Sequence, residues 1–307
     1  MKHFVHIFLL LSMCFCFQVQ AQGLKTFKLK NGMSVFIWED SGKSDVFGEV
    51  VVRTGAVNDP EQYTGLAHYL EHVMFKGTQK IGALDWEKEA PIYEQIIAKY
   101  DEMAGENDPV RKEVIGKEIN NLTIEAGKIS LSNEFSELIE GMGGTGLNAG
   151  TSLDYTVFYN TFPPYQINKW LEISQNELET VYEEYNRNKD NPNSQTGEFM
   201  MQQAFAGHPY SRSILGLGEH LKNPRLSKLI EFYEQWYVPE NMVLVLVGNI
   251  KAQQISGRIN AAFGRLAAKP SPERKVYQNL EIKGRKQYSA KVGFYPQVAM
   301  VFNGVPA

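Results

Sequence analysis

Hydrophobic and polar residues alternate with a period of two along several stretches of the chain, which predicts β-strands. The stretch "LKTFKLKNGMSVFIWED" alternates on both sides of Asn31 and Gly32, and this dipeptide between two alternating runs indicates a β-hairpin. Further strands are expected in "DVFGEVVVRTG" and, around Thr156 and Phe158, in "LNAGTSLDYTVFYNTF". The apolar run "NMVLVLVGN" lies between turn residues and is typical of a buried strand.

Apolar residues recur with helical spacing in other parts of the chain. Between about Ala83 and Leu131 two such stripes are separated by Asp108 and Pro109, a good start for the second helix. We therefore expect an inserted helical hairpin at the surface. Further helices are expected from about Gly65 to Lys76, from about Gln166 to Arg187, over "EFMMQQAF" and from about Leu226 to Trp236.

Composition allows a buried catalytic centre and argues against nucleic-acid binding. The 307 residues are 43% hydrophobic and 12% aromatic, which is enough for one large domain or two smaller ones with real cores. Only 21% of the residues are charged and the formal net charge is -4, so the chain lacks the basic surface that nucleic acid requires. We expect no nucleic-acid partner.

The N-terminus resembles an export signal. Lys2 and His3 precede the apolar run "FVHIFLLLSMCFCF", and "VQA" ends at Ala21, where cleavage after a small residue is expected. We therefore predict a signal peptide over residues 1–21 and a periplasmic or secreted protein. The alternative is that this segment stays as a membrane anchor. Both cysteines lie inside it, so the mature chain needs no disulfide.

A change of composition near residue 269 suggests a domain boundary. The segment "KPSPERK" from Lys269 is typical of a linker, and the later run "QVAMVFNGVPA" is strand-like. We expect one zinc-binding domain over residues 22–268, with the helical insertion at about 83–131. Residues 269–307 would hold the linker and the start of a truncated second domain.

The most informative chemistry lies in "HYLEH", which places His68 and His72 four residues apart. On a helix that begins after Thr64, its expected N-cap, the two imidazoles lie on one face and can reach a single point. Glu71 lies close to that face and can reach a water there without being a ligand. The alternative is a pair of solvated or core histidines, but burying them without a shared partner is costly. The pattern favours a zinc site with the inverted H-x-x-E-H order.

A catalytic zinc normally takes three protein ligands and keeps one position for water. The third ligand is expected from "ELETVYEEY", where Glu177 and Glu184 lie seven residues apart and share a helical face. One of them would bind the metal and the other would orient a histidine. The alternative is an ordinary acidic helix surface.

These residues and several further segments resemble the pitrilysin (insulinase) family of zinc metallopeptidases. The similarity runs in the family's order from about Leu24 to Lys251, through "GLAHYLEHVMFKGT", "LNAGTSLDYTVFY", "ELETVYEEYNR", "GHPYSRSILG" and "YVPENMVLVLVGNI". The resemblance implies an α+β fold, with a mixed β-sheet packed by helices. In members of this family, two similar halves usually enclose the substrate in a chamber.

The resemblance also implies a role for each candidate residue. His68, His72 and Glu184 would hold one Zn²⁺ per chain, and Glu71 would be the general base in peptide-bond hydrolysis. Glu177 would orient one of the zinc-binding histidines without contacting the metal itself. Asn148 and Ala149 would lie on the edge strand that pairs with the substrate backbone. All of these residues lie within "LNAGTSLDYTVFY", "ELETVYEEYNR" or "HYLEH".

The expected partner is a peptide or an unfolded protein segment, cleaved by an exported zinc endopeptidase. In the family a second half supplies an arginine and a tyrosine that grip the substrate, so another half or chain is expected to supply them here. The first alternative is a non-catalytic or truncated subunit that binds a partner or peptide without cleaving it. The intact motif at Glu71 argues against that subunit. A second alternative is a zinc hydrolase with another substrate, against which the match at Asn148 argues.

Overall fold

The computed structural model describes residues 23–74, 80–131, 133–178, 195–222, 224–278, 284–291, 298 and 300–302. The predicted signal peptide and Glu184 lie outside these residues, as does most of the strand-like run near the C-terminus. The expected boundary after residue 268 follows the last described helix, and the division into domains stays a prediction.

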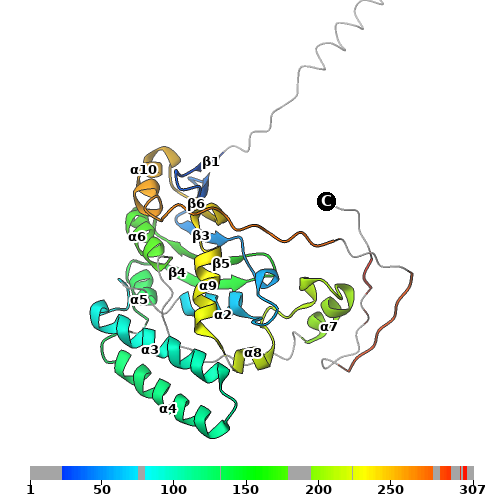
Figure 1. Cartoon of the computed structure of the whole chain (residues 1–307). Coiled ribbons are helices and arrows are strands. Elements are labelled where there is room, and N and C mark those ends of the chain that lie inside the picture. Colours follow the sequence, from blue (N-terminus) through cyan, green and yellow to red (C-terminus); the bar gives the residue numbers. More distant parts are fainter. Residues whose placement is uncertain are drawn as a thin grey trace, which may run out of the picture.

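A six-stranded mixed sheet forms the centre of the molecule (Figure 1), with the order β1-β2-β6-β3-β5-β4. The strands are β1 (Leu24–Lys28), β2 (Ser34–Glu39), β3 (Val46–Val52), β4 (Thr145–Thr151), β5 (Thr156–Phe162) and β6 (Met242–Gly248). Only β2 and β6 pair in parallel; the other neighbours are antiparallel. The predicted hairpin is confirmed as β1 and β2, which turn at Gly32 with a φ of 93°.

The sequence predicts one strand in "LNAGTSLDYTVFYNTF", whereas the structure has two, β4 and β5, joined by a short turn. Only the family resemblance, which expects Asn148 and Ala149 on an edge strand, points to the first of these, "TGLNAGT". It contains two glycines and no alternation of apolar side chains, so its hydrophobic pattern carries no strand signal. A register shift between Thr145 and Asn148 interrupts its pairing with β5. β4 forms one edge of the sheet, and its position there is set by pairing rather than by its own composition.

The longer described helices are α2 (Leu66–Met74), α3 (Trp86–Gly105), α4 (Pro109–Ala126), α5 (Glu134–Gly141), α6 (Ile167–Glu177), α7 (Gln195–Ala204), α9 (Leu226–Trp236) and α10 (Ala252–Phe263). A short helix α8 (Gly218–Lys222) and the 3-10 turns η1 (Ala56–Asn58), η2 (Pro164–Gln166), η4 (Pro209–Ser211) and η5 (Pro239–Asn241) connect them. Helices α5, α8 and α10 are not among those predicted from the sequence. None of the helices in the described part of the chain has the length and apolarity needed to cross a membrane.

One face of the sheet builds the main core. Along β2, β3 and β6 buried residues alternate with partly exposed ones, and the buried set packs with α2, α6, α9 and α10. On the opposite face Phe36 and Trp38 of β2 are 39% and 40% exposed. The one-sided pattern explains why period-two alternation located these strands.

The predicted helical hairpin is confirmed as α3 and α4, drawn in cyan and green at the lower left of Figure 1. Asp108 caps α4 by accepting a hydrogen bond from the Val110 N–H at 3.0 Å, and Pro109 opens the helix. The hairpin has its own apolar cluster around Ile92 and Ile96, separate from the main core. It is therefore an addition to the sheet rather than part of its packing.

Candidate active site

Helix α2 brings the two motif histidines together. Its apolar residues are buried in the main core, while His68 is half-buried and His72 is exposed on the other face. Their Nε2 atoms lie 3.1 Å apart and their rings meet edge to face, with centroids 4.5 Å apart. The spacing of four residues thus directs both nitrogens to one point, as a helix requires.

The histidine pair fits a zinc ion. Two ligands about 2.0–2.1 Å from a tetrahedral zinc lie roughly 3.3 Å from each other, close to the 3.1 Å between the two Nε2 atoms. Burial, and then the neighbouring His72, lower the pKa of His68, although Glu71 acts in the opposite direction. A neutral imidazole is the form that binds a metal. No set of three metal-binding side chains occurs within the described residues.

Glu71 is held against the sheet. Its side chain is 8% exposed, and the Thr151 Oγ1 donates a hydrogen bond of 2.7 Å to Glu71 Oε2. Thr151 is the last residue of β4, so this bond ties the second turn of α2 to the end of the edge strand. The sequence does not reveal the contact of Thr151 with Glu71, because it spans 80 positions and no local pattern marks it.

Asn148 and Ala149 lie on edge strand β4, where the sequence analysis places them. The Ser152 N–H donates to the Tyr155 carbonyl at 2.8 Å across the turn. Because hydrogen-bonded pairs alternate along an antiparallel ladder, the N–H of Ala149 points away from β5. In agreement, Asn148 Oδ1 accepts that N–H at 2.9 Å. The strand thus has an outward backbone group beside the helix of the histidines.

Of the two candidate glutamates, Glu177 lies at the end of a described helix and Glu184 lies outside the described residues. Glu177 is the last residue of α6, and only its backbone is described. The sequence predicts one helix as far as Arg187, whereas the described helix ends at Glu177 and residues 179–194 lie outside the described part. The roles of Glu177 and Glu184 stay predictions.

The start of α2 is capped by Asp59 rather than by Thr64. Asp59 Oδ2 accepts the Gly65 N–H at 2.6 Å and Oδ1 accepts the Ala67 N–H at 2.9 Å. The hydroxyl of Thr64 instead accepts the Leu217 N–H at 2.9 Å. Burial raises the pKa of Asp59 to about 7, against the opposing effect of these N–H groups and Arg212. Six positions separate Asp59 from Gly65, so the usual capping spacing could not reveal it.

His208 and His220 are predicted to be structural or solvent-facing, and both make structural hydrogen bonds. His208 Nδ1 accepts the Tyr210 N–H at 3.1 Å and caps η4. His220 Nδ1 accepts the Thr64 N–H at 3.1 Å. These bonds give both histidines structural contacts in the described fold.

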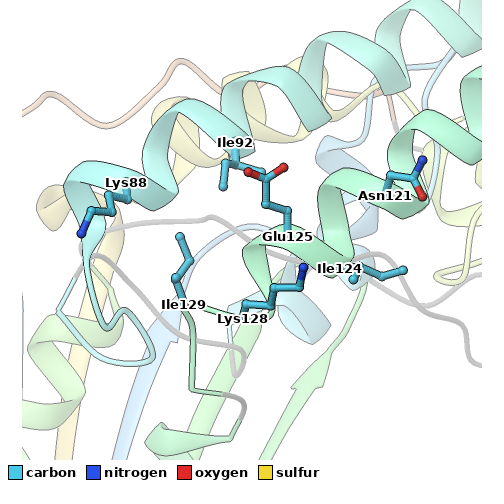
Figure 2. A pocket seen from close by; sticks show the side chains of 7 residues that line it. All are labelled: Lys88, Ile92, Asn121, Ile124, Glu125, Lys128 and Ile129. Atoms are coloured by element: carbon cyan, nitrogen blue, oxygen red, sulfur yellow. The ribbon is translucent and has the colours of Figure 1, made fainter.

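An open groove of about 770 Å³ runs along the outer hairpin (Figure 2). It lies between α3 and α4 and is lined by Lys88, Ile92, Asn121, Ile124, Glu125, Lys128 and Ile129. None of the predicted site residues is among them. The candidate active site lies instead at α2 and β4, where the histidine pair and Glu71 share one helix and Thr151 of β4 contacts Glu71.

Two family models match separate parts of the chain. Residues 35–90, which include "HYLEH", match the model "Insulinase (Peptidase family M16)", and residues 225–307 match "Peptidase M16 inactive domain". The chain is 22% identical over 249 residues to "Uncharacterized zinc protease YmxG" of Bacillus subtilis, covering 80% of this chain and 51% of that protein. It is 23% identical over 229 residues to "Zinc protease PqqE" of Helicobacter pylori, covering 74% and 44%.

Among solved structures, the chain is similar to the first half of the periplasmic protease PqqL from Escherichia coli. The TM-score is 0.58 at 20% identity, and the match covers 83% of this chain and 48% of that one. This likeness shows the fold, a mixed sheet with helices as in pitrilysin-like halves, and confirms the α+β prediction. The chain spans about half the length of the curated relatives it matches.

Proposed function

We propose that this chain is an exported zinc metalloendopeptidase of the M16 peptidases, the insulinase- and pitrilysin-like family. The partial matches to two family models and the similarity to zinc proteases support the proposal. One observation carries the proposal. Two histidine nitrogens converge 3.1 Å apart, beside a glutamate that is hydrogen-bonded to the end of an open strand edge. Its substrate would be a peptide or an unfolded protein segment.

The proposed ligands of the zinc are His68, His72 and Glu184, with Glu177 orienting one of them. When bound, a zinc ion in such a site acts as a Lewis acid and makes water a nucleophile at neutral pH. Glu71 would accept the proton of the attacking water. Because Thr151 occupies its Oε2, the other carboxylate oxygen is the one available for that proton.

The peptide would add to the sheet beside β4. Its carbonyl would take the Ala149 N–H from Asn148 Oδ1, and the Asn148 amide would then be available to the peptide. This strand ends at Thr151, next to Glu71, so pairing would bring one peptide bond to the histidines. Backbone pairing at the open edge would thus orient the peptide without selecting for its amino-acid sequence.

We also propose export to the periplasm or outside the cell, on the predicted signal peptide over residues 1–21. The curated relatives are about twice as long as the matched region. A second homologous half, in the same protein or in another chain, would supply further substrate contacts. Activity of this chain alone would then be weaker than activity with that half.

Zinc content tests the proposed metal site. The purified protein is expected to hold one tightly bound zinc after dialysis, measured by elemental analysis, and the Glu184→Ala variant is expected to lose it or hold it weakly because one of three protein ligands is removed. A variant with full zinc content would contradict the role of Glu184. A parent protein without zinc would contradict the proposed function and favour a peptide-binding subunit.

Backbone pairing at β4 is tested by Ala149→Pro, which removes the outward N–H without removing a ladder bond. We expect kcat/KM for peptide cleavage to fall by about tenfold. This is the effect expected when the peptide carbonyl loses one hydrogen bond and stays desolvated. The matched control is Thr26→Pro on β1, the other edge, where alternation from the Glu39 N–H to Gly23 bond directs the Thr26 N–H outward. An equal loss in both variants would count against peptide pairing at β4.

A further inference from the structure

The loop that leads into α2 is fastened by a segment from a distant part of the sequence. We call residues 209–221, which contain η4 and most of α8, the clamp segment. Its Arg212 donates from Nη1 to the Asp59 carbonyl at 3.0 Å. Its His220 Nδ1 accepts the Thr64 N–H at 3.1 Å, and its Leu217 N–H donates to the Thr64 hydroxyl at 2.9 Å. This segment includes most of "GHPYSRSILG", a motif to which the proposed chemistry gives no role.

The clamp segment and the loop cross with their backbones in close contact. Gly216 has a φ of 80°, and a Cβ there would lie 2.4 Å from the Thr64 carbonyl oxygen. Gly65 has a φ of 90°, and its Cβ would lie 2.6 Å from the Leu215 carbonyl oxygen. Both positions therefore require glycine. The crossing fixes the chain one residue before α2 begins.

Asp59 carries this restraint into the helix itself. Its side chain is 4% exposed, and its two oxygens accept the N–H groups of Gly65 and Ala67 at 2.6 and 2.9 Å. Ala67 directly precedes His68. A carboxylate in this position also offsets the partial positive charge of the helix N-terminus.

Helix α2 is thus held at two points on either side of His68. Asp59 holds the first turn, and Thr151 holds Glu71 in the second turn. We propose that Asp59, braced by Arg212, is a positioning residue that fixes the rotation of α2 relative to β4, so that His68 and Glu71 face the same point. This inference rests on the proposed function. In the described part of the chain the Asp59 carboxylate accepts backbone N–H groups of Gly65 and Ala67, so it acts through the backbone at the start of α2.

Asp59→Asn tests the proposal, because asparagine keeps the size but replaces one accepting oxygen by an amide and removes the charge. Its matched control is Asp108→Asn, which makes the same change at the N-cap of α4 on the outer hairpin. Zinc affinity is measured by competition with a chromophoric chelator. In the same preparations kcat and KM are measured at saturating zinc, and circular dichroism confirms folding.

We expect Asp59→Asn to weaken zinc binding by about tenfold, in the range known for residues that support metal ligands. At saturating zinc, kcat is expected to fall by a similar factor while KM changes by less than about twofold, because a displaced helix affects positioning rather than peptide binding. Asp108→Asn should change neither quantity by more than about twofold, although both caps contribute to stability.

Equal zinc affinity in the parent and a folded Asp59→Asn protein would overturn the inference, and so would equal losses in the two variants. If Asp59→Asn does not fold, Arg212→Lys decides instead. It keeps the charge but loses the paired N–H groups, so about threefold weaker zinc binding is expected, and unchanged binding overturns the inference. Zinc absent from the parent would overturn the proposed function, which is a distinct result.

Discussion

Replacing Glu71 by glutamine is expected to lower peptide hydrolysis by about 10²- to 10⁴-fold, the usual contribution of a positioned general base. Glutamine has nearly the same shape and can still accept the hydrogen bond that Thr151 donates to Glu71 in the parent. It cannot take a proton from water. Zinc content should stay at one per chain, because Glu71 is not among the proposed ligands. The measurement is cleavage of a fluorogenic peptide together with elemental analysis.

A control for this substitution is Glu89→Gln on α3. Glu89 is also buried, with 2% of its surface exposed, and it accepts the Leu84 N–H at 3.0 Å. The same chemical change is therefore made in a similar environment on the outer hairpin. Activity should remain close to that of the parent. Loss of zinc in the Glu71→Gln protein, or retention of most of its activity, would remove Glu71 from the role of base.

Truncation of Trp170 to alanine is expected to lower the free energy of unfolding by about 3–5 kcal/mol, as for other large aromatic side chains in cores. Trp170 on α6 is 1% exposed and stacks on Phe162 of β5 with ring centroids 4.8 Å apart. Its Nε1 donates to Asn160 Oδ1 at 2.7 Å, so truncation also leaves a buried acceptor without its partner. Urea unfolding measures the change.

Gly48 provides an internal check on that value. A Cβ at this position of β3 would lie 2.4 Å from the Trp170 ring, so Gly48→Ala alone should be destabilising. In combination with Trp170→Ala the added methyl enters the vacated space. The double variant should therefore be more stable than the sum of the two single changes predicts. Strict additivity would mean that the ring does not occupy the space beside Gly48.

The sequence was most informative where a pattern is local. The β1-β2 hairpin, the strand β6, the hairpin of α3 and α4 and the pairing of His68 with His72 all depend on spacing within a few residues. A period of two or of four is written directly in the side chains. Asn148 and Ala149 are different, because their strand has no pattern of its own and only the family resemblance places them on a strand edge.

The parts that sequence could not predict depend on contacts between distant residues. Thr151 meets Glu71 across 80 positions, and His220 meets Thr64 across 156. Asp59 caps a helix that begins seven residues later, because the chain turns back on itself at the crossing with Gly216. None of these partners differs in type from an ordinary surface residue. Only the packing of the folded chain selects them.

The hydrogen bond between Asn148 Oδ1 and the Ala149 N–H bears on the behaviour of the protein without substrate. An exposed sheet edge is a template for pairing with any other extended chain, including another copy of the same protein. Here the side chain covers one of the edge groups that such pairing would use. An unrelated strand that pairs here must break the Asn148–Ala149 hydrogen bond and gains little binding energy in return. A peptide substrate must break the same bond, but its further contacts at the histidines would offset that cost. The same amide would therefore keep the proposed substrate-binding edge from becoming a site of aggregation.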